Sequence, residues 1–157
     1  PRTWTRLSRP HPEVWRTMEE LQRDGRVRCI GVSNVTADQL TALCRHAEVR
    51  PAFVQNRCFA RLGWDRDVRA VCRHEGVVYQ GFSLLTANRA ELASRTVGAI
   101  AERLRATRAQ VIFAFALALG MICLTGTTDP RHMREALAAA DLELSPGEID
   151  ALEPISG

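Results

Sequence analysis

Apolar residues recur along the chain in two alternating kinds of pattern. In residues 12–24, Trp15, Met18 and Leu21 are three positions apart, which is the spacing of one helix face. Residues 27–32 form a short apolar run rich in β-branched side chains, which is typical of a strand covered on both faces. Because such runs alternate along the chain, the pattern predicts a parallel sheet with helices outside it.

The same pattern predicts elements over the whole chain. Strands are predicted at residues 27–32, 53–58, 77–82 and 121–125. Helices are predicted at residues 12–24, 36–47, 65–75, 97–106, 108–119 and 129–139, with a short last helix after Ser145. Residues 1–12 are predicted to be extended or loop, and residues 83–95 a longer loop. The chain is therefore predicted to contain four strand-helix units with one extra helix.

One stretch combines a helix stop, a strand and a polar pair. Gly25 follows the first helical run and suits the left-handed turn that ends a helix. Gly31 permits close backbone approach, and Ser33 and Asn34 follow at the carboxyl end of the strand, where parallel strands present ligands. The alternative is that Ser33 and Asn34 only turn the chain and cap the helix that begins near Ala37.

Composition and charge exclude several classes of function. The chain has 157 residues, of which 46% are hydrophobic and 25% charged, as in a soluble globular protein. No apolar run approaches the roughly 20 residues of a membrane span, and the first twelve residues do not resemble a signal peptide. All 21 basic residues are arginines, scattered among 18 acids, which disfavours a nucleic-acid surface. Neither a membrane nor a nucleic acid is therefore an expected partner.

The five cysteines stand singly, with no paired or metal-like spacing. They lie at apolar positions: Cys29, Cys44, Cys58, Cys72 and Cys123. An odd number of dispersed thiols favours core packing and a reducing compartment, and we expect a cytoplasmic protein without a metal site.

Several motifs resemble those of one known family. They are residues 15–21 (WRTMEEL), 25–28 (GRVR), 30–34 (IGVSN), 50–56 (RPAFVQN), 81–85 (GFSLL) and 124–128 (LTGTT). In this order they resemble the carboxyl half of an aldo-keto reductase. The resemblance implies an α/β fold, namely a partial (β/α)8 TIM barrel of about four strand-helix units. A complete barrel typically needs about 250 residues, so residues 1–157 are expected to be a C-terminal half, truncated at the N-terminus.

The resemblance also implies a site for a nicotinamide cofactor. In the family, residues at the positions of Ser33, Asn34 and Gln55 hydrogen-bond the nicotinamide carboxamide, which needs both donors and acceptors. The residue at the position of Phe82 stacks on the nicotinamide ring. Read without the family, Phe82 is equally well a core aromatic residue.

Further residues are implied for the rest of the cofactor. Ser83, Leu85 and Asn88 correspond to a loop that contacts the pyrophosphate, and the turn formed by Gly126, Thr127 and Thr128 precedes a helix N-terminus, which attracts anions. Thr128 or Asp129 is equally expected to cap that helix. Where many members carry lysine and arginine near the adenosine 2'-phosphate, this chain has Gly126 and His132, with Arg131 nearby. The resemblance implies NADP as the cofactor, and the missing lysine and arginine leave NAD possible, although Arg131 could partly compensate.

This sequence departs from the family in its catalytic residues. The family's reductases transfer a hydride to an aldehyde or ketone while a tyrosine, assisted by lysine, aspartate and histidine, donates the proton. Those residues belong to the half that this chain does not match. The chain has one tyrosine, Tyr79, inside a predicted strand, and no lysine to lower a phenol pKa. No catalytic residue is assigned, and little activity is expected from the chain alone.

Three alternatives follow from these observations. The chain is the cofactor-binding half of a reductase for small carbonyl substrates, or a non-catalytic NAD(P)-binding regulatory module of the same family. An unrelated phosphate-binding barrel would require an accidental motif match. Four strands also leave two open sheet edges, which a missing N-terminal half or a second copy of the chain would cover.

Overall fold

The structure, a computed structural model, describes residues 12–154, so the predicted segment before Pro12 lies outside the described residues. Its four strands form one sheet in the order β1-β2-β3-β4. The strands are β1 (Gly31–Ser33), β2 (Phe53–Arg57), β3 (Val78–Phe82) and β4 (Ile122–Leu124). β1 pairs with β2 and β3 with β4, both in parallel. The predicted α/β fold with parallel strands is confirmed.

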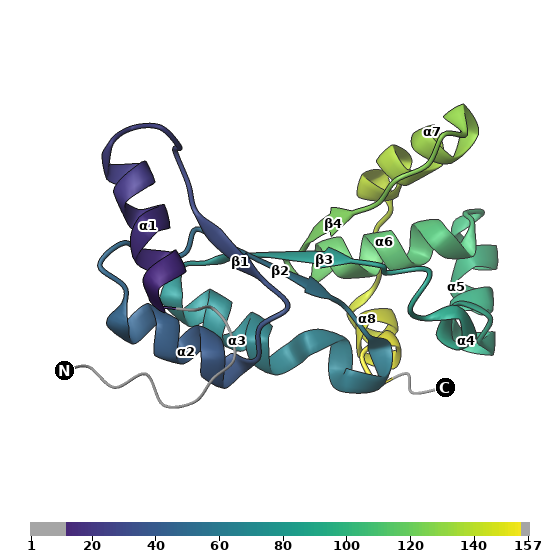
Figure 1. Ribbon diagram of the computed structural model, residues 1–157. Helices are drawn as coiled ribbons and strands as arrows, with labels where there is room; N and C mark the ends of the chain where they lie inside the picture. The colour runs from purple at the N-terminus through teal and green to yellow at the C-terminus, as the bar shows by residue number, and fades with distance from the viewer. Residues whose placement is uncertain (1–11, 155–157) are drawn as a thin grey trace. The chain divides into compact units, whose positions relative to one another are not determined.

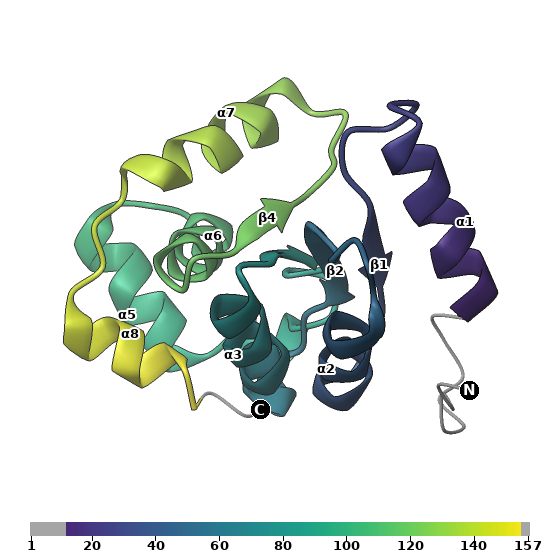
Figure 2. The ribbon, with the colours of Figure 1, turned by 90° about the vertical axis from the view of Figure 1, so that its left-hand side faces the viewer.

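The described chain forms two compact units. Residues 12–56 and 67–79 make the first, and residues 57–66 and 80–154 make the second. In the first unit, α1 (Pro12–Arg23) and α2 (Ala37–His46) match the predicted helices. α3 (Arg66–Glu75) also matches, and it lies beside α2 in both views (Figures 1 and 2).

The core of the first unit forms around α1. Trp15, Ile30 and Leu43 are buried together, and Met18 and Val32 pack against them. Trp15 and Met18 stand three residues apart on one helix face, as the periodicity predicts. The buried stripe of α2 is also as predicted, and it includes Leu43 and Cys44.

Strand β1 is shorter than predicted. The predicted strand at residues 27–32 is wrong in its first half, where Val27 is 39% exposed. Gly25 adopts the left-handed conformation expected of a helix end, with φ +71°. As a result the backbone N–H groups of Arg26 and Val27 both donate to the Leu21 carbonyl. The chain leaves the helix turn only after Val27, so the strand begins later.

At the start of β1, Gly31 lies opposite Phe53 of β2. A Cβ atom at Gly31 would lie 2.6 Å from the Phe53 carbonyl oxygen. This confirms the expected close approach, because a real side chain at Gly31 would force the two strands apart.

In the second unit, helix α6 (Arg108–Ala118) is central. It packs against α5 (Arg95–Leu104), α7 (Pro130–Ala138), the 3-10 helix η2 (Ala139–Asp141), α8 (Pro146–Leu152) and β4. Six consecutive residues of α6 are buried, from Val111 to Ala116. Because neighbours surround the helix, its sequence needs no polar face.

Two elements of the second unit were not predicted. The short helix α4 (Arg89–Leu92) lies in the predicted loop, and the 3-10 helix η1 (Ala60–Asp65) precedes α3. In η1, Trp64 is fully buried with a positive φ of 55°. Its indole Nε1 donates to the Leu152 carbonyl at 3.0 Å, and its ring meets Phe115 edge-to-face. Tertiary burial of the indole therefore stabilises a backbone conformation that local sequence disfavours.

Several helices begin just after a residue whose side chain caps their first turn. Ser145 and Glu148 form the predicted capping box, and Thr36 forms a second one at α2. Thr36, rather than Ser33 or Asn34, therefore caps α2. Helix α5 begins two residues earlier than predicted because the Ser94 hydroxyl accepts from the Val97 N–H.

The cysteines divide between core and surface. All five are free; Cys44, Cys58 and Cys72 are buried as expected. The expectation is wrong for Cys29, which is exposed because the segment before β1 runs outside the core. Cys123 is partly buried, and this burial raises its thiol pKa to about 11.

No helix among residues 12–154 is long and apolar enough to cross a membrane.

Candidate functional site

In the first unit, a polar cluster lies where β1 ends beside the middle of β2. The Ser33 hydroxyl donates to the Gln55 carbonyl at 2.7 Å, and the Asn34 backbone N–H donates to the same carbonyl at 3.0 Å. The Asn34 side-chain Nδ2 donates to the Ser33 oxygen at 3.2 Å. Ser33 and Asn34 are exposed and Gln55 is half-buried. The structure therefore brings these three predicted residues together.

The backbone around this cluster is unusual. Asn34 has a φ of 55°, in the left-handed region that asparagine tolerates better than most residues. Next to it, the buried Asn56 side chain accepts from the Val35 N–H at 3.0 Å and donates to the Val35 carbonyl at 2.7 Å. The Asn56 side chain thus bonds both backbone polar groups of Val35, as a neighbouring strand would, and it stabilises the turn after β1. Sequence reasoning placed Asn56 in a motif but gave it no role.

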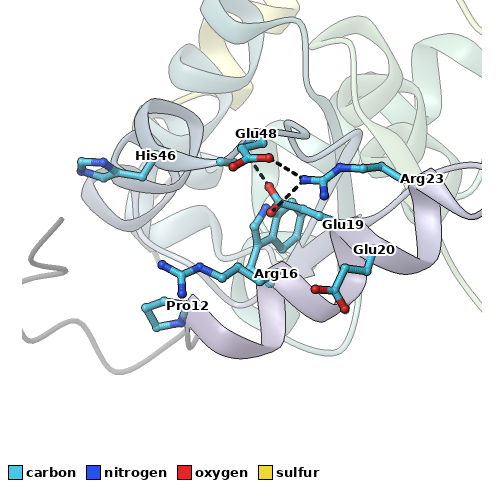
Figure 3. A pocket seen from close by; sticks show the side chains of 9 residues that line it. Pro12, Arg16, Glu19, Glu20, Arg23, His46 and Glu48 are labelled. Carbon is cyan, nitrogen blue, oxygen red and sulfur yellow. Dashed lines mark hydrogen bonds and ion pairs between the residues drawn. The ribbon is translucent and has the colours of Figure 1, made fainter. Parts of the chain in front are cut away.

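The first unit also contains a charged cavity of about 220 Å³ beside α1 (Figure 3). Glu19, only 3% exposed, projects from α1, and its Oε1 accepts from the backbone N–H groups of Glu48 and Val49 at 2.7 and 2.9 Å. Arg23 joins the same group through Glu48 Oε2 at 2.7 Å. The buried Trp15 Nε1, which borders this cavity, has no hydrogen-bond partner among the described residues. Glu19 therefore binds the connection between α2 and β2 to helix α1.

In the second unit, the loop after β3 presents the next predicted residues. Ser83 has a positive φ of 58°, and Phe82 is half-buried. A cavity of about 260 Å³ opens here. Its lining is Ser83, Leu84, Leu85, Thr86, Phe113, Leu124, Thr125 and Gly126. A strained serine at a strand end is the kind of backbone feature that clusters at binding sites.

Asn88 has a structural task in this loop. It is 1% exposed, and its Oδ1 accepts from the Ala60 N–H at 2.8 Å. Its Nδ2 donates to the carbonyls of Cys58 at 3.0 Å and Leu84 at 2.8 Å. The side chain thus ties the segment after β2 to the segment after β3. These bonds use both polar atoms of the Asn88 side chain, which was predicted to lie in a loop that contacts pyrophosphate.

A larger cavity of about 480 Å³ lies between α6 and α7 in the same unit. Its lining is Leu85, Thr107, Arg108, Ala109, Gln110, Phe113, Thr125, Gly126, Thr127, Arg131, His132, Glu135 and Ala136. It shares Leu85, Phe113, Thr125 and Gly126 with the smaller cavity. Apolar and polar side chains both line this cavity, as is common in pockets that bind small organic ligands.

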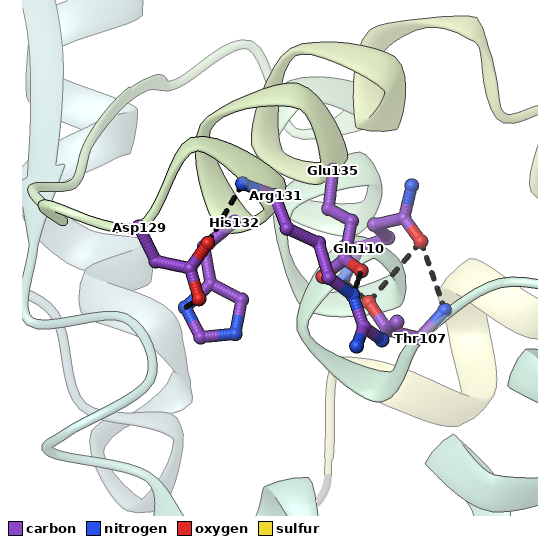
Figure 4. A network of polar contacts seen from close by, with 6 residues as sticks. All are labelled: Thr107, Gln110, Asp129, Arg131, His132 and Glu135. Carbon is purple, nitrogen blue, oxygen red and sulfur yellow. Dashed lines mark hydrogen bonds and ion pairs between the residues drawn. The ribbon is translucent and has the colours of Figure 1, made fainter.

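The rim of the larger cavity is a network of polar contacts (Figure 4). Arg131 Nε donates to Glu135 Oε1 at 2.7 Å, and this pair raises the pKa of Arg131. His132 Nδ1 lies 3.8 Å from Asp129 Oδ2. Arg108 Nη1 donates to the carbonyls of Leu92 and Ser94. Arg108 and Arg131 therefore each donate to an oxygen of the protein, and His132 lies near a carboxylate.

The N-terminus of α7 is capped by a carboxylate. Asp129 Oδ1 accepts from the Arg131 N–H at 2.7 Å, and Pro130 occupies the first turn. Thr127 Oγ1 in turn accepts from the Asp129 N–H at 3.1 Å. Of the two expected caps, Asp129 is the one observed. The anion at this helix end is therefore already supplied by the protein.

The predicted residues of the second unit separate into two groups. Leu85, Gly126, Thr127 and His132 line the larger cavity, and Ser83 lines the smaller one. Phe82, Asn88 and Thr128 line neither of the two. Sequence reasoning missed the α6 residues of the rim and Glu135. The start of α6 was predicted at residue 108, but the capping pair Thr107 and Gln110, which opens the helix, was not recognised as part of a site.

Comparison with known proteins identifies the family. A sequence model of the Aldo/keto reductase family matches residues 3–156. The chain is 28% identical over 146 residues to glyoxal reductase of Bacillus subtilis, covering 93% of this chain and 52% of that protein. It is 33% identical over 141 residues to pyridoxine 4-dehydrogenase of Escherichia coli, covering 88% and 48%. The chain belongs to the aldo/keto reductase family.

Solved structures agree with this assignment. Aldose reductase from Schistosoma japonicum superposes with a TM-score of 0.83 at 25% identity, covering 94% of this chain and 48% of that one. A silkworm (Bombyx mori) aldo-keto reductase complexed with NADPH gives a TM-score of 0.81 at 24% identity, covering 90% and 46%. The chain spans about half the length of the relatives it matches, and its fold is the corresponding part of their barrel.

Proposed function

We propose that this chain is the cofactor-holding, carboxyl-terminal half of an aldo-keto reductase barrel. In the complete barrel, a hydride would pass between NAD(P)H and the carbonyl of a small aldehyde or ketone. The observation that carries the proposal is the cluster of Ser33, Asn34 and Gln55, where the end of β1 pairs with the middle of β2. A primary amide such as the nicotinamide carboxamide needs partners of this neutral kind.

The hydrogen bonds within the cluster support a different role for each side chain. Ser33 gives its proton to the Gln55 carbonyl, so toward a ligand its oxygen acts as an acceptor. Asn34 gives one Nδ2 proton to Ser33, which leaves its Oδ1 to accept from the ligand NH2. The Gln55 side chain then supplies the N–H donor for the ligand carbonyl.

The larger cavity of the second unit would, by itself, accept an adenosine group. Leu85, Phe113 and Ala136 form apolar contacts for an adenine ring. Ser83, in the left-handed conformation, would face the pyrophosphate, while Asn88 holds the loop that presents it. Gly126 and Thr127 complete the wall.

The proton donor of the reaction would come from outside this chain. Tyr79 is only 4% exposed, and the chain contains no lysine to acidify it. The same observation favours the second candidate, a non-catalytic NAD(P)-binding module that acts in a cytoplasmic regulatory role. The two candidates share the cofactor site. They differ in whether a complementary half supplies the catalytic tyrosine, lysine, aspartate and histidine.

Binding of the reduced cofactor to the 157-residue chain tests the site. Nicotinamide fluorescence on titration would give the affinity of the parent chain and of the Ser33→Ala/Asn34→Gly double variant. Glycine is chosen at position 34 because it adopts the φ of 55° without strain. Loss of two hydrogen bonds predicts an affinity reduced about tenfold or more.

A matched variant separates binding from stability. Thr36→Ala removes a hydroxyl three residues from Ser33 and deletes the cap of α2, so it should lower stability by about 1 kcal/mol. Its cofactor affinity should equal that of the parent chain. Equal affinity of the double variant and the parent would remove the nicotinamide assignment.

A further inference from the structure

A patch of basic and aromatic side chains, formed by Arg57, Phe59 and Arg61, begins at the last residue of β2 and belongs to the second unit. The Cζ atoms of Arg57 and Arg61 lie over the Phe59 ring, at 5.3 and 5.0 Å from its centroid. Both arginines are exposed and Phe59 is half-buried, whereas Cys58 and Ala60 between them are buried. The segment therefore alternates as a strand does, with its basic and aromatic side chains toward solvent.

The two guanidinium groups of the patch are not neutralised by the protein. Within residues 12–154, neither Arg57 nor Arg61 has a hydrogen-bond or ion-pair partner. By contrast, Arg103 of the same unit is held by Glu148 at 2.6 Å. Because both Cζ atoms lie over one ring, they are within about 10 Å of each other, roughly one Debye length at 0.1 M salt. The two cations therefore repel each other, and a bound anion would relieve that repulsion.

The backbone of the patch is fixed on both sides of Phe59. The buried Asn88 side chain accepts from the Ala60 N–H at 2.8 Å and donates to the Cys58 carbonyl at 3.0 Å. The Phe59 carbonyl accepts from the Leu62 N–H at 3.1 Å. Because these bonds form without a ligand, binding at the patch does not have to order the backbone, which lowers the entropic cost of binding.

The chemistry of the patch suits one class of ligand. Guanidinium groups bind carboxylates through paired hydrogen bonds, and an arginine stacked on a ring face can keep its in-plane N–H donors for such a partner. Leu62, which follows Arg61, is 65% exposed and adds apolar surface. An aromatic carboxylate combines both features, since its carboxylate reaches the guanidinium groups while its ring packs on Phe59 and Leu62.

We propose that Arg57, Phe59 and Arg61 form a binding site for a small aromatic carboxylate. Arg57 and Arg61 bind the carboxylate oxygens, and Phe59 positions both guanidinium groups and contacts the ring of the ligand. The site uses none of the residues proposed above to hold the cofactor. It is therefore independent of the proposed function.

Three small probes separate the effect of charge from that of shape. Benzoate carries a carboxylate and a ring, benzamide has the same shape without the charge, and acetate has the carboxylate without the ring. Each is titrated into the 157-residue chain at constant ionic strength, and backbone amide shifts are followed by NMR. Benzoate should shift residues 57–62 and bind about tenfold more tightly than benzamide, because its hydrogen bonds are charge-assisted. It should also bind several-fold more tightly than acetate.

Arginine variants provide a matched control. Arg57 and Arg61 are exposed, so the chain should remain folded when either is replaced. Arg57→Gln and Arg61→Gln should each weaken benzoate binding about fivefold and leave benzamide binding unchanged. Arg73, on α3 in the first unit, is also exposed. Arg73→Gln removes the same charge elsewhere and should leave the affinity for benzoate unchanged.

Each alternative result would overturn the proposal without touching the cofactor site. Equal affinities for benzoate and benzamide would show that binding does not depend on the guanidinium charges. Acetate that binds as tightly as benzoate would remove the aromatic part of the ligand class. Equal losses from Arg61→Gln and Arg73→Gln would reduce the effect to net charge, and benzoate that leaves residues 57–62 unshifted would remove the site.

Discussion

Replacement of Glu19 by alanine should strongly destabilise the first unit. Glu19 is almost fully buried, and its Oε1 accepts from the Glu48 and Val49 N–H groups. Glu19→Ala leaves both donors without that partner. Hydrogen bonds to a charged group contribute about 1.5–3 kcal/mol each, and these donors are only partly buried, so the expected loss is about 3 kcal/mol.

Two further variants make the reasoning specific. Glu19→Gln keeps an oxygen acceptor at the same place and should cost only about 1 kcal/mol. Glu20→Ala changes the neighbouring, exposed glutamate and should stay within about 0.5 kcal/mol of the parent. Ranked from most to least destabilising, the variants should therefore be Glu19→Ala, Glu19→Gln and Glu20→Ala.

Urea unfolding followed by circular dichroism measures these differences, with the m-value checked for constancy. In thermal melts, a loss of about 3 kcal/mol corresponds to a Tm lower by about 6–12 °C. If Glu19→Ala and Glu20→Ala unfold at the same urea concentration, the two backbone hydrogen bonds do not stabilise the α2–β2 connection, and the reasoning is refuted.

Two further predictions concern pH and thiol chemistry. Hydrogen bonding from Arg103 lowers the pKa of Glu148, so the pair stabilises the fold above the ordinary pKa of 4.5, and this contribution is lost as pH falls through the lowered value. Urea midpoints of Arg103→Ala and the parent should therefore differ at neutral pH and converge in acid; a constant difference contradicts this. At about pH 8, iodoacetamide should alkylate exposed Cys29 long before Cys123, whose pKa of about 11 leaves roughly one thiol in a thousand ionised. Peptide mass mapping checks the order, and equal rates would argue against it.

Local signals in the sequence predicted most of the fold. Helix positions followed from apolar periodicity, and the end of α1 followed from Gly25. The predicted strands match the observed ones to within a few residues, except at the start of β1. There, apolar residues such as Val27 looked like strand, but two backbone bonds to the Leu21 carbonyl extend the helix turn. Hydrogen bonds of this kind carry no compositional signal.

The residues of the site could be predicted from the sequence only where they belong to short contiguous motifs. Ser33, Asn34 and Gln55 came from family motifs, and their mutual hydrogen bonds follow from strand register. Glu135 was missed because its pair with Arg131 spans one helix turn and its place in the cavity lining depends on the packing of α7 against α6. Asn88 was recognised, but two of its three backbone partners, Ala60 and Cys58, lie 28 and 30 residues away in the sequence.

The bonds of Asn88 also bear on how fast a ligand exchanges. Asn88 hydrogen-bonds the loop after β3 to the segment after β2 without a ligand. The entropic cost of ordering this loop therefore falls on folding rather than on ligand binding. A nucleotide should therefore associate in a single concentration-dependent phase, without a slow closing step. Differences in affinity among nucleotides should appear in their dissociation rates, and amide hydrogens at Ala60 should exchange slowly with or without ligand.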